Sequence, residues 1–198
     1  MRIRKATLND VNDIVEIHMD AFRGFFLTSL GPSFLRLYYT CFIRSEDTIT
    51  MVAEENNIIC GFSALTRKSK GFNSSLIKSN IFDFVLLSIR LLFTSPKSLI
   101  RLVKNLTKKS DDVEDDEDYA ELYSIGVNKV AQGKGVGKAL LSASELKLKD
   151  AEIKRVSLTT DYNDNKQAIG FYQSMGYEIM YDFVTYPNRR MYRFMKKL

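Results

Sequence analysis

The stretch that decides the fold is Gln132-Gly133-Lys134-Gly135-Val136-Gly137-Lys138, which follows the apolar segment 120–127 and opens a helical pattern over 135–149. Glycines at such a place let the backbone adopt positive φ angles and lie close to a ligand. Successive N–H groups at a helix N-terminus form a site for phosphate oxygens. Lys134 and Lys138 add positive charge beside them. The sequence therefore predicts an anion-binding loop between a strand and a helix.

Two common phosphate-binding motifs do not fit this loop. A Walker loop would need a glycine where Gln132 stands and a hydroxyl residue where Ala139 stands, so its Mg²⁺ ligand is missing. A dinucleotide fingerprint, Gly-x-Gly-x-x-Gly, would need its third glycine at Lys138 or at Leu140 in the two registers available. The pattern that fits is Gln-x-x-Gly-x-Gly, carried by Gln132, Gly135 and Gly137.

Strands and helices alternate on both sides of the loop. Alternating or continuous apolar residues predict strands over 2–6, 48–54, 58–66, 120–127, 155–160, 177–186 and 190–195. Apolar residues at helical spacing predict helices over 7–22, 31–42, 135–149 and 165–175. This order predicts an α/β or α+β fold, in which a sheet is layered with helices.

The pattern changes over residues 68–118, which we expect to be a helical insertion plus an acidic linker within a single domain, 1–198. Residues 76–93 predict one helix, which Ser95-Pro96 ends. Residues 97–109 predict a basic amphipathic helix, and seven of the eight residues over 111–118 are acidic, typical of a solvated linker. The insertion could be an extra helical layer, a homodimer interface, or a contact with an anionic membrane surface through 76–109.

Composition excludes several classes of function. The chain has 198 residues, one histidine, two cysteines without C-x-x-C spacing, and a net charge of +5. Structural zinc sites and disulfide scaffolds are therefore not expected, and free cysteines with no visible signal peptide favour the cytoplasm. The most apolar stretch contains Lys78, Asp83 and Arg90, which argues against a membrane-spanning helix. No nucleic-acid partner is expected, because the basic residues are not interleaved with aromatics and an acidic block adjoins them.

Two blocks of the chain resemble the GNAT family of N-acetyltransferases. Residues 121–141 resemble its acetyl-CoA-binding motif, and Asn165-Lys-Gln-Ala-Ile-Gly-Phe-Tyr-Gln-Ser-Met-Gly-Tyr177 resembles its Asn-x-x-Ala-x-x-Phe-Tyr-x-x-x-Gly-Phe/Tyr signature. The blocks occur in the family's order, and the resemblance leaves out only residues 68–118. It implies a mixed, splayed central sheet of about six to seven strands flanked by helices, which opens between 120–127 and 155–160.

The resemblance also implies how acetyl-CoA would be bound, with no metal involved. The pantetheine arm would pair with backbone groups at 125–127, where a bulge near Ile125-Gly126 would open the ladder. The pyrophosphate would lie on the amides of 133–138, and Asn165 would hydrogen-bond the pantetheine. The implied binding residues are Ile125, Gly126, Val127, Gln132, Gly133, Lys134, Gly135, Val136, Gly137, Lys138, Asn165 and Tyr172.

Acetyl transfer to an amine requires loss of an amine proton, polarisation of the thioester carbonyl and protonation of the leaving thiolate. The resemblance implies that Tyr172 is the general acid and that the Val127 N–H polarises the carbonyl oxygen. Glu121 opens the motif strand, where some members carry the general base, acting directly or through water. A second family position for a base falls on Thr160, which cannot serve, so the base is Glu121, Asp161 or bulk water.

The acceptor is less defined by the sequence than the donor. Phe25, Phe26 and Leu27 lie between the first two helices, in the region that often shapes the family's acceptor pocket. We expect transfer to a primary amine of a small molecule, such as an amino sugar or polyamine, or of a protein. Transfer of a longer acyl group and a non-catalytic acyl-CoA-binding module are the alternatives. His18 is expected to pack in the core.

Overall fold

The computed structural model describes residues 1–94, 115–185 and 188–198. Their centre is a seven-stranded sheet in the order β1-β2-β3-β4-β5-β7-β6, which confirms the mixed sheet predicted from the sequence. Among the described strands only β4 and β5 pair in parallel. The strands are β1 Arg2–Lys5, β2 Thr48–Glu55, β3 Ile58–Thr66, β4 Ala120–Val127, β5 Arg155–Asp161, β6 Glu178–Thr185 and β7 Arg189–Lys197.

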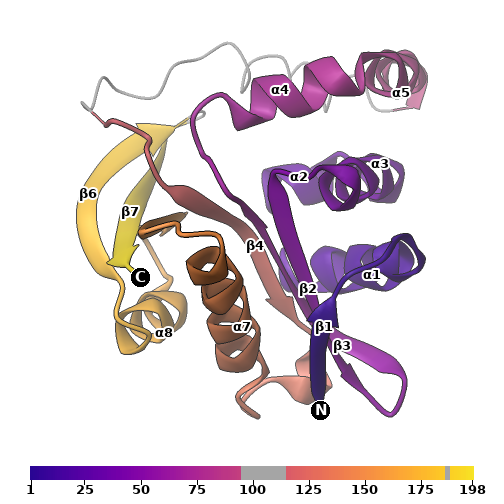
Figure 1. Ribbon diagram of the computed structural model, residues 1–198. Coiled ribbons are helices and arrows are strands. Elements are labelled where there is room, and N and C mark those ends of the chain that lie inside the picture. The colour runs from indigo at the N-terminus through magenta and orange to yellow at the C-terminus, as the bar shows by residue number, and fades with distance from the viewer. Residues whose placement is uncertain (95–114, 186–187) are drawn as a thin grey trace.

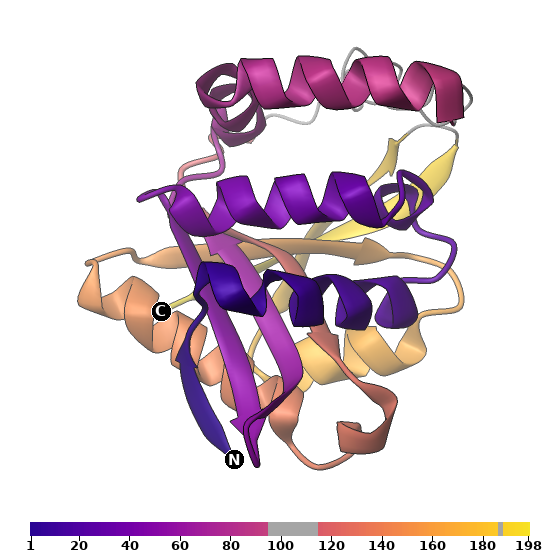
Figure 2. The same ribbon diagram turned by 90° about the vertical axis from the view of Figure 1, so that its right-hand side faces the viewer.

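Helices cover both faces of the sheet (Figures 1 and 2). One face carries α1 (Val11–Ala21), the short α2 (Phe26–Ser29) and α3 (Pro32–Arg44). The other carries α7 (Val136–Asp150), with α8 (Lys166–Ser174) beside it. Short 3-10 turns, Leu8–Asp10 and Lys129–Ala131, precede α1 and α7. The chain enters the first turn as expected for a capping box, because the Thr7 N–H donates to Asp10 Oδ2 at 2.7 Å.

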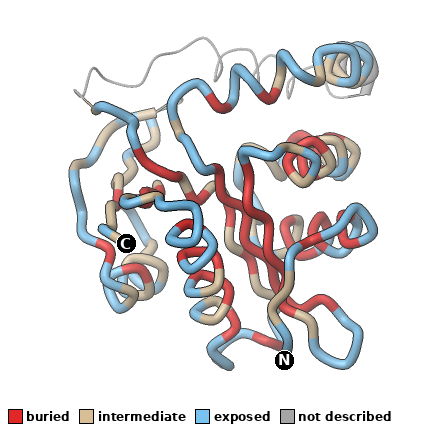
Figure 3. The backbone as a smooth tube through the Cα atoms, viewed as in Figure 1, coloured by how far each residue is buried: buried red, intermediate tan, exposed pale blue. Residues whose placement is uncertain are grey.

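Two apolar layers hold these helices against the sheet (Figure 3). The layer under α1 and α3 contains fully buried rings and aliphatic chains, including Tyr39, Phe42 and Phe62. The layer under α7 contains Leu140, Leu158 and other buried residues. Because strand side chains alternate between faces, each central strand contributes to both layers. The sheet is thereby fixed from both sides up to the point where β4 and β5 part.

The two strands part because of a bulge in β4. The β3–β4 register pairs Leu65 with Leu122 and then Ala64 with Ser124, which leaves Tyr123 as the extra residue. The parallel β4–β5 pairing ends at Leu122 and Leu158. The expectation of a bulge near Ile125-Gly126 was therefore wrong by two to three residues. Since the extra residue reverses the alternation, everything after Tyr123 faces the opposite side from the one that uninterrupted pairing would give.

The predicted helix over 76–93 is two helices, α4 (Phe72–Ser79) and α5 (Ile81–Thr94). The break falls at Asn80, whose side-chain Nδ2 donates to the Leu76 carbonyl at 2.9 Å and so competes with the helical ladder. Phe84 of α5 packs on Phe34 of α3, with ring centroids 6.2 Å apart. The outward side of α5 leaves apolar side chains exposed: Phe82 by 88% and Leu86 by 70%.

The end of the acidic block is attached to the sheet. Asp115 accepts hydrogen bonds from the hydroxyls of Tyr119 and Tyr181, both at 2.6 Å, and Asp116 pairs with Arg155 at 2.8 Å. Asp115 and Asp116 thus anchor this end of the block, while residues 116–118 stay exposed to solvent as expected of a linker. The predicted helix 97–109 and residues 111–114 lie outside the described residues. Within the described ranges, no helix combines the length and apolarity needed to cross a membrane.

We predict that Gly126→Ala destabilises the fold through crowding alone, since its φ is not positive. A Cβ there would lie 2.9 Å from Phe62 Cε1 and 3.3 Å from Ile17 Cγ2, where there is no free space. The free energy of unfolding should fall by about 1–3 kcal/mol, measured by urea denaturation. The control is Gly170→Ala in α8, where a Cβ meets nothing within 4 Å and helix propensity should add about 0.5–1 kcal/mol. If the two substitutions change the free energy of unfolding equally, crowding at Gly126 is not the cause.

Candidate active site

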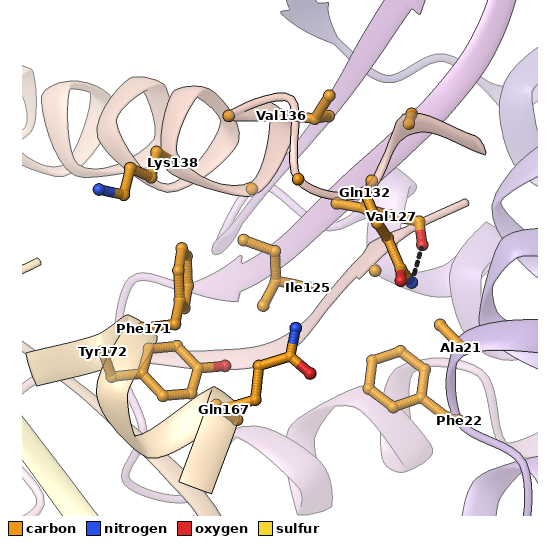
Figure 4. A pocket seen from close by; sticks show the side chains of 16 residues that line it. Ala21, Phe22, Ile125, Val127, Gln132, Val136, Lys138, Gln167, Phe171 and Tyr172 are labelled. Atoms are coloured by element: carbon orange, nitrogen blue, oxygen red, sulfur yellow. Dashed lines mark hydrogen bonds between the residues drawn. The ribbon is translucent and has the colours of Figure 1, made fainter. Parts of the chain in front are cut away.

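A cavity of about 620 Å³ occupies the opening between β4 and β5 (Figure 4). We name it the donor cavity. Its floor is the C-terminal part of β4, and its walls are the loop before α7, the first turn of α7, one side of α8 and the end of α1. It is lined by Ala21, Phe22, Ile125, Gly126, Val127, Ala131, Gln132, Gly133, Gly135, Val136, Gly137, Lys138, Gln167, Ala168, Phe171 and Tyr172.

The glycines of the loop have the conformation that the sequence predicted. Gly133 has φ 74° and Gly135, the residue before α7, has φ 80°, both in the left-handed region. A side chain at either position would strain the backbone. Gly137 lies in the first turn of α7, where a Cβ would touch Phe171 Cζ at 3.5 Å. The loop therefore presents backbone amides and the helix N-terminus to the cavity, an arrangement that suits phosphate oxygens.

The end of β4 turns backbone groups toward the same cavity. The Asn128 N–H donates to the Cys60 carbonyl on β3 at 2.9 Å. Because backbone groups alternate in direction along a strand, those of Ile125 and Val127 face the side that β5 has left. Consistent with this, Gln132 Nε2 reaches the Val127 carbonyl at 3.2 Å (Figure 4). An extended amide-containing ligand could pair with β4 here as an added strand.

A second cavity, of about 510 Å³, adjoins the first on the side of α1 and α2. We name it the acceptor cavity. The two cavities share Ala21, Phe22, Ile125, Ala168 and Tyr172. The rest of its lining is His18, Phe25, Phe26, Leu27, Leu122, Tyr123, Ser124, Thr159, Thr160, Asn165, Arg189 and Met191. Two ligands could thus lie end to end, one in each cavity, with Tyr172 at their junction.

Tyr172 is held firmly at this junction. Its ring packs against Tyr177 and Phe194, with centroids 5.9 and 6.0 Å away, and the residue is 9% exposed. Figure 4 shows its hydroxyl directed into the donor cavity, between Ile125 and Gln167. Burial raises the pKa of Tyr172 above its ordinary value. The hydroxyl is therefore protonated at neutral pH and available as a proton donor.

Glu121, the predicted base, lies outside the linings of both cavities. Arg193 Nη1 donates to Glu121 Oε1 at 2.5 Å, and Ser69 Oγ donates to Oε2 at 2.5 Å. Both members of the ion pair are largely buried, with side-chain exposures of 14% for Arg193 and 13% for Glu121. A carboxylate occupied on both oxygens is suited to joining β4 to β7. The surroundings of Glu121 thus give no support to a role in proton transfer.

The other predicted residues divide between the two cavities. Lys138 lines the donor cavity, whereas Lys134 does not. Asn165 lines the acceptor cavity, where its Nδ2 donates to Thr160 Oγ1 at 2.5 Å. Asp161 forms a two-bond ion pair with Arg189. The predicted acceptor residues Phe25, Phe26 and Leu27 all line the acceptor cavity.

Several lining residues were missed by the sequence reasoning. Gln167 and Phe171 fall inside the second motif block, so the block itself was the available signal. Phe22 and His18 follow the apolar spacing of α1, and nothing in that pattern distinguishes a cavity wall from core. His18 shares a hydrogen bond with the Tyr39 hydroxyl, 2.6 Å from its Nδ1, and its Nε2 is buried without a partner. Burial lowers the pKa of His18 to about 4, so the ring is neutral at pH 7.

Comparison with known proteins agrees with this geometry. YxbD, an uncharacterized protein of Bacillus subtilis, is 39% identical over 70 residues, which make up 35% of this chain and 42% of that protein. The chain spans less than half the length of the curated relatives it matches. A ribosomal-protein-alanine N-acetyltransferase from Brucella melitensis has the same fold, with a TM-score of 0.64 at 15% identity and 100% coverage of both chains.

A second solved structure has the same fold, the PaiA N-acetyltransferase from Thermoplasma acidophilum in complex with coenzyme A. Its TM-score is 0.62 at 15% identity, covering 100% of this chain and 98% of that one. The model of the "Acetyltransferase (GNAT) family" matches residues 11–177. The resemblance predicted from the two motif blocks is thereby confirmed, and the chain belongs to the GNAT family of acetyltransferases.

Proposed function

We propose that the chain is an acetyl-CoA-dependent N-acetyltransferase that moves an acetyl group directly to a primary amine of a small molecule or protein. The observation that carries this proposal is Tyr172, a buried proton donor at the junction of two adjoining cavities. Cys41 and Cys60 are buried and line neither cavity, which favours direct transfer over a covalent acyl-enzyme. Membership of the family supports the same activity.

We propose that acetyl-CoA binds in the donor cavity. The amides of 133–138 and the N-terminus of α7 would hold the pyrophosphate, with Lys138 contributing charge. The backbone of Ile125 and Val127 would pair with the amides of the pantetheine arm, which would replace the missing β5 ladder. This arrangement would bring the thioester to the Tyr172 hydroxyl. We retain Asn165 as a candidate contact for the pantetheine at the boundary of the acceptor cavity.

The proposed transfer assigns each proton and each bond to a named group. The neutral amine nitrogen attacks the thioester carbonyl, the N–C bond forms, the nitrogen releases one proton to water and the C–S bond breaks. Tyr172 gives its hydroxyl proton to the leaving sulfur and regains one from solvent. The Val127 N–H, on the open side of β4, would stabilise the negative charge on the carbonyl oxygen.

We propose that water, rather than Glu121, removes the amine proton. Glu121 is bound by Arg193 and Ser69, and Asp161 by Arg189. Within the described lining of the acceptor cavity there is no Asp or Glu. An alkyl amine has a pKa of about 10.4, so the reactive neutral form is scarce at pH 7. The rate should therefore rise with pH as that form accumulates.

Other expectations from the sequence stay proposals. We propose one domain over 1–198 and a cytoplasmic location. We also propose a homodimer or membrane-surface contact through 76–109, for which the support is the exposed apolar side of α5. Transfer of a longer acyl group and a non-catalytic acyl-CoA-binding role remain the alternatives to acetyl transfer.

We predict that acetyl-CoA raises the melting temperature. At 100 times the Kd the stabilisation is about 2.7 kcal/mol, or about 5–10 °C for a chain of this size. Gly135→Glu should abolish the shift, because it places a charge and a strained residue at the phosphate site. The matched control is Gly71→Glu, which also precedes a helix with a positive φ, 73°, but does not line the donor cavity. Loss of the shift in both variants would contradict the assignment.

We predict that Tyr172→Phe lowers kcat by about 100-fold or more and leaves acetyl-CoA binding nearly unchanged, because only the proton donor is removed. Steady-state kinetics and calorimetric titration measure the two effects. Tyr177→Phe is the control: its hydroxyl donates to Glu145 at 3.0 Å and it lines neither cavity. It should reduce stability and not kcat. Parallel losses of kcat and affinity in Tyr172→Phe would make the residue a binding group.

We predict that Glu121→Gln acts on stability. The variant removes the carboxylate that pairs with the largely buried Arg193, at a cost of about 3–5 kcal/mol in the free energy of unfolding. The pH profile of kcat/KM should keep its shape, because Glu121 lines neither cavity and is not the base. Disappearance of an acid limb in that profile would restore Glu121 as the base.

A further inference from the structure

Apolar side chains form much of the wall of the acceptor cavity. Aromatic and aliphatic side chains from α1, α2 and the loop between them form one side: Phe22, Phe25, Phe26 and Leu27. Leu122, Ile125 and Met191 from the strands form the other. The polar side chains of the lining are those of His18, Tyr123, Ser124, Thr159, Thr160, Asn165, Tyr172 and Arg189. Apart from Arg189 they are uncharged, so this cavity of about 510 Å³ suits a small ligand that has an apolar part and needs no counter-charge.

Resting on the function proposed above, we propose that the acceptor is a small primary amine with an apolar body and no second positive charge. The observation behind this is the charge of the lining. Arg189 is the one described lining residue that is charged at neutral pH. Asp161 binds it through Nε and Nη2, and its guanidinium lies 4.8 Å from the centroid of the Phe25 ring.

The polar side of the cavity also carries no net charge. His18 is neutral at pH 7, shares its Nδ1 hydrogen bond with Tyr39 and packs on Phe22, with ring centroids 4.7 Å apart. Thr160 accepts from Asn165. These groups can accept or donate single hydrogen bonds, but they cannot balance an ammonium ion. The cavity thus offers hydrogen-bonding dipoles to one amine and an apolar surface to the rest of the acceptor.

The chemistry of transfer makes a lining of no net charge select against acceptors that carry a second amine. The reacting amine must be neutral when it attacks, so it needs no carboxylate in the site. A second amine on the same molecule has no reason to lose its proton. It would enter as an ammonium ion that loses water and finds no free carboxylate among the described lining residues. Polyamines, which the sequence left open as acceptors, carry several such charges, as does any amino sugar with more than one amine.

The test compares two acceptors that differ in one charge. Hexylamine and 1,6-diaminohexane have the same length, and the diamine adds only a terminal ammonium. With the purified chain and acetyl-CoA, release of free thiol is measured for each amine at one pH. We expect kcat/KM for hexylamine to exceed that for the diamine by at least about 10-fold, and 2-phenylethylamine to be accepted as well. Equal use of the diamine, or a preference for spermidine or kanamycin, would overturn the inference.

A charge variant provides the second measurement. Met191→Glu places a carboxylate in the lining and should reduce the ratio between hexylamine and the diamine by several-fold, because the ammonium gains a partner. Met191→Gln, of similar shape and no charge, should keep the wild-type ratio. If both variants change the ratio alike, the charge argument is wrong. Should they fail to fold, the comparison on the unaltered chain still decides.

A wrong donor and a wrong acceptor class would give different experimental results. If acetyl-CoA gives no thermal shift, the donor assignment fails. If acetyl-CoA binds but no apolar monoamine is acetylated, or only polycationic amines are, the donor assignment holds and the acceptor class proposed here is wrong.

Discussion

The parting of β4 from β5 after Leu122 and Leu158 is the constraint on which the rest of the site depends. A single extra residue, Tyr123, reverses the alternation of β4, so that Tyr123 and Ser124 both lie toward α1 and α3. Beyond it, β4 stays paired with β3 and has lost its partner on the other side. An unpaired strand edge inside a domain is normally a liability. Here the glycine loop, α7 and α8 close around it and leave a ligand-sized opening.

On the two sides of this opening, one cavity presents mainly backbone groups and the other mainly side chains. The donor cavity relies on amides: those of the glycine loop, the first turn of α7 and the free side of β4. Such groups recognise a phosphate and an extended amide chain with little dependence on side-chain identity. The acceptor cavity relies on side chains from the segment after α1 and from β7. A change of acceptor therefore requires only substitutions there, while the donor site stays constant.

The sequence predicted the donor half of the site better than the acceptor half. Gly135 and Tyr172 belong to local motifs in which spacing alone constrains the geometry. The bulge was misplaced because a register shift in β4 depends on its pairing with β3, which no local pattern records. The family resemblance suggested Glu121 as a base, and its ion pair was not foreseen because the partner, Arg193, lies 72 residues away in the chain. The break at Asn80 was missed because one side chain competes with the ladder inside an otherwise continuous apolar pattern.

The lack of a carboxylate base and the lack of negative charge among the described residues of the acceptor cavity have one cause, which is that the nearby carboxylates are paired with arginines. A carboxylate that accepts the amine proton would also attract and hold ammonium ions, and so would favour polycations. With Glu121 bound to Arg193 and Asp161 to Arg189, both nearby carboxylates are neutralised by arginines of the same strand, β7. On the proposed function, the site would therefore receive an amine that has already lost its proton in water. Turnover at pH 7 would be limited by that small fraction, in exchange for rejecting acceptors with a second charge.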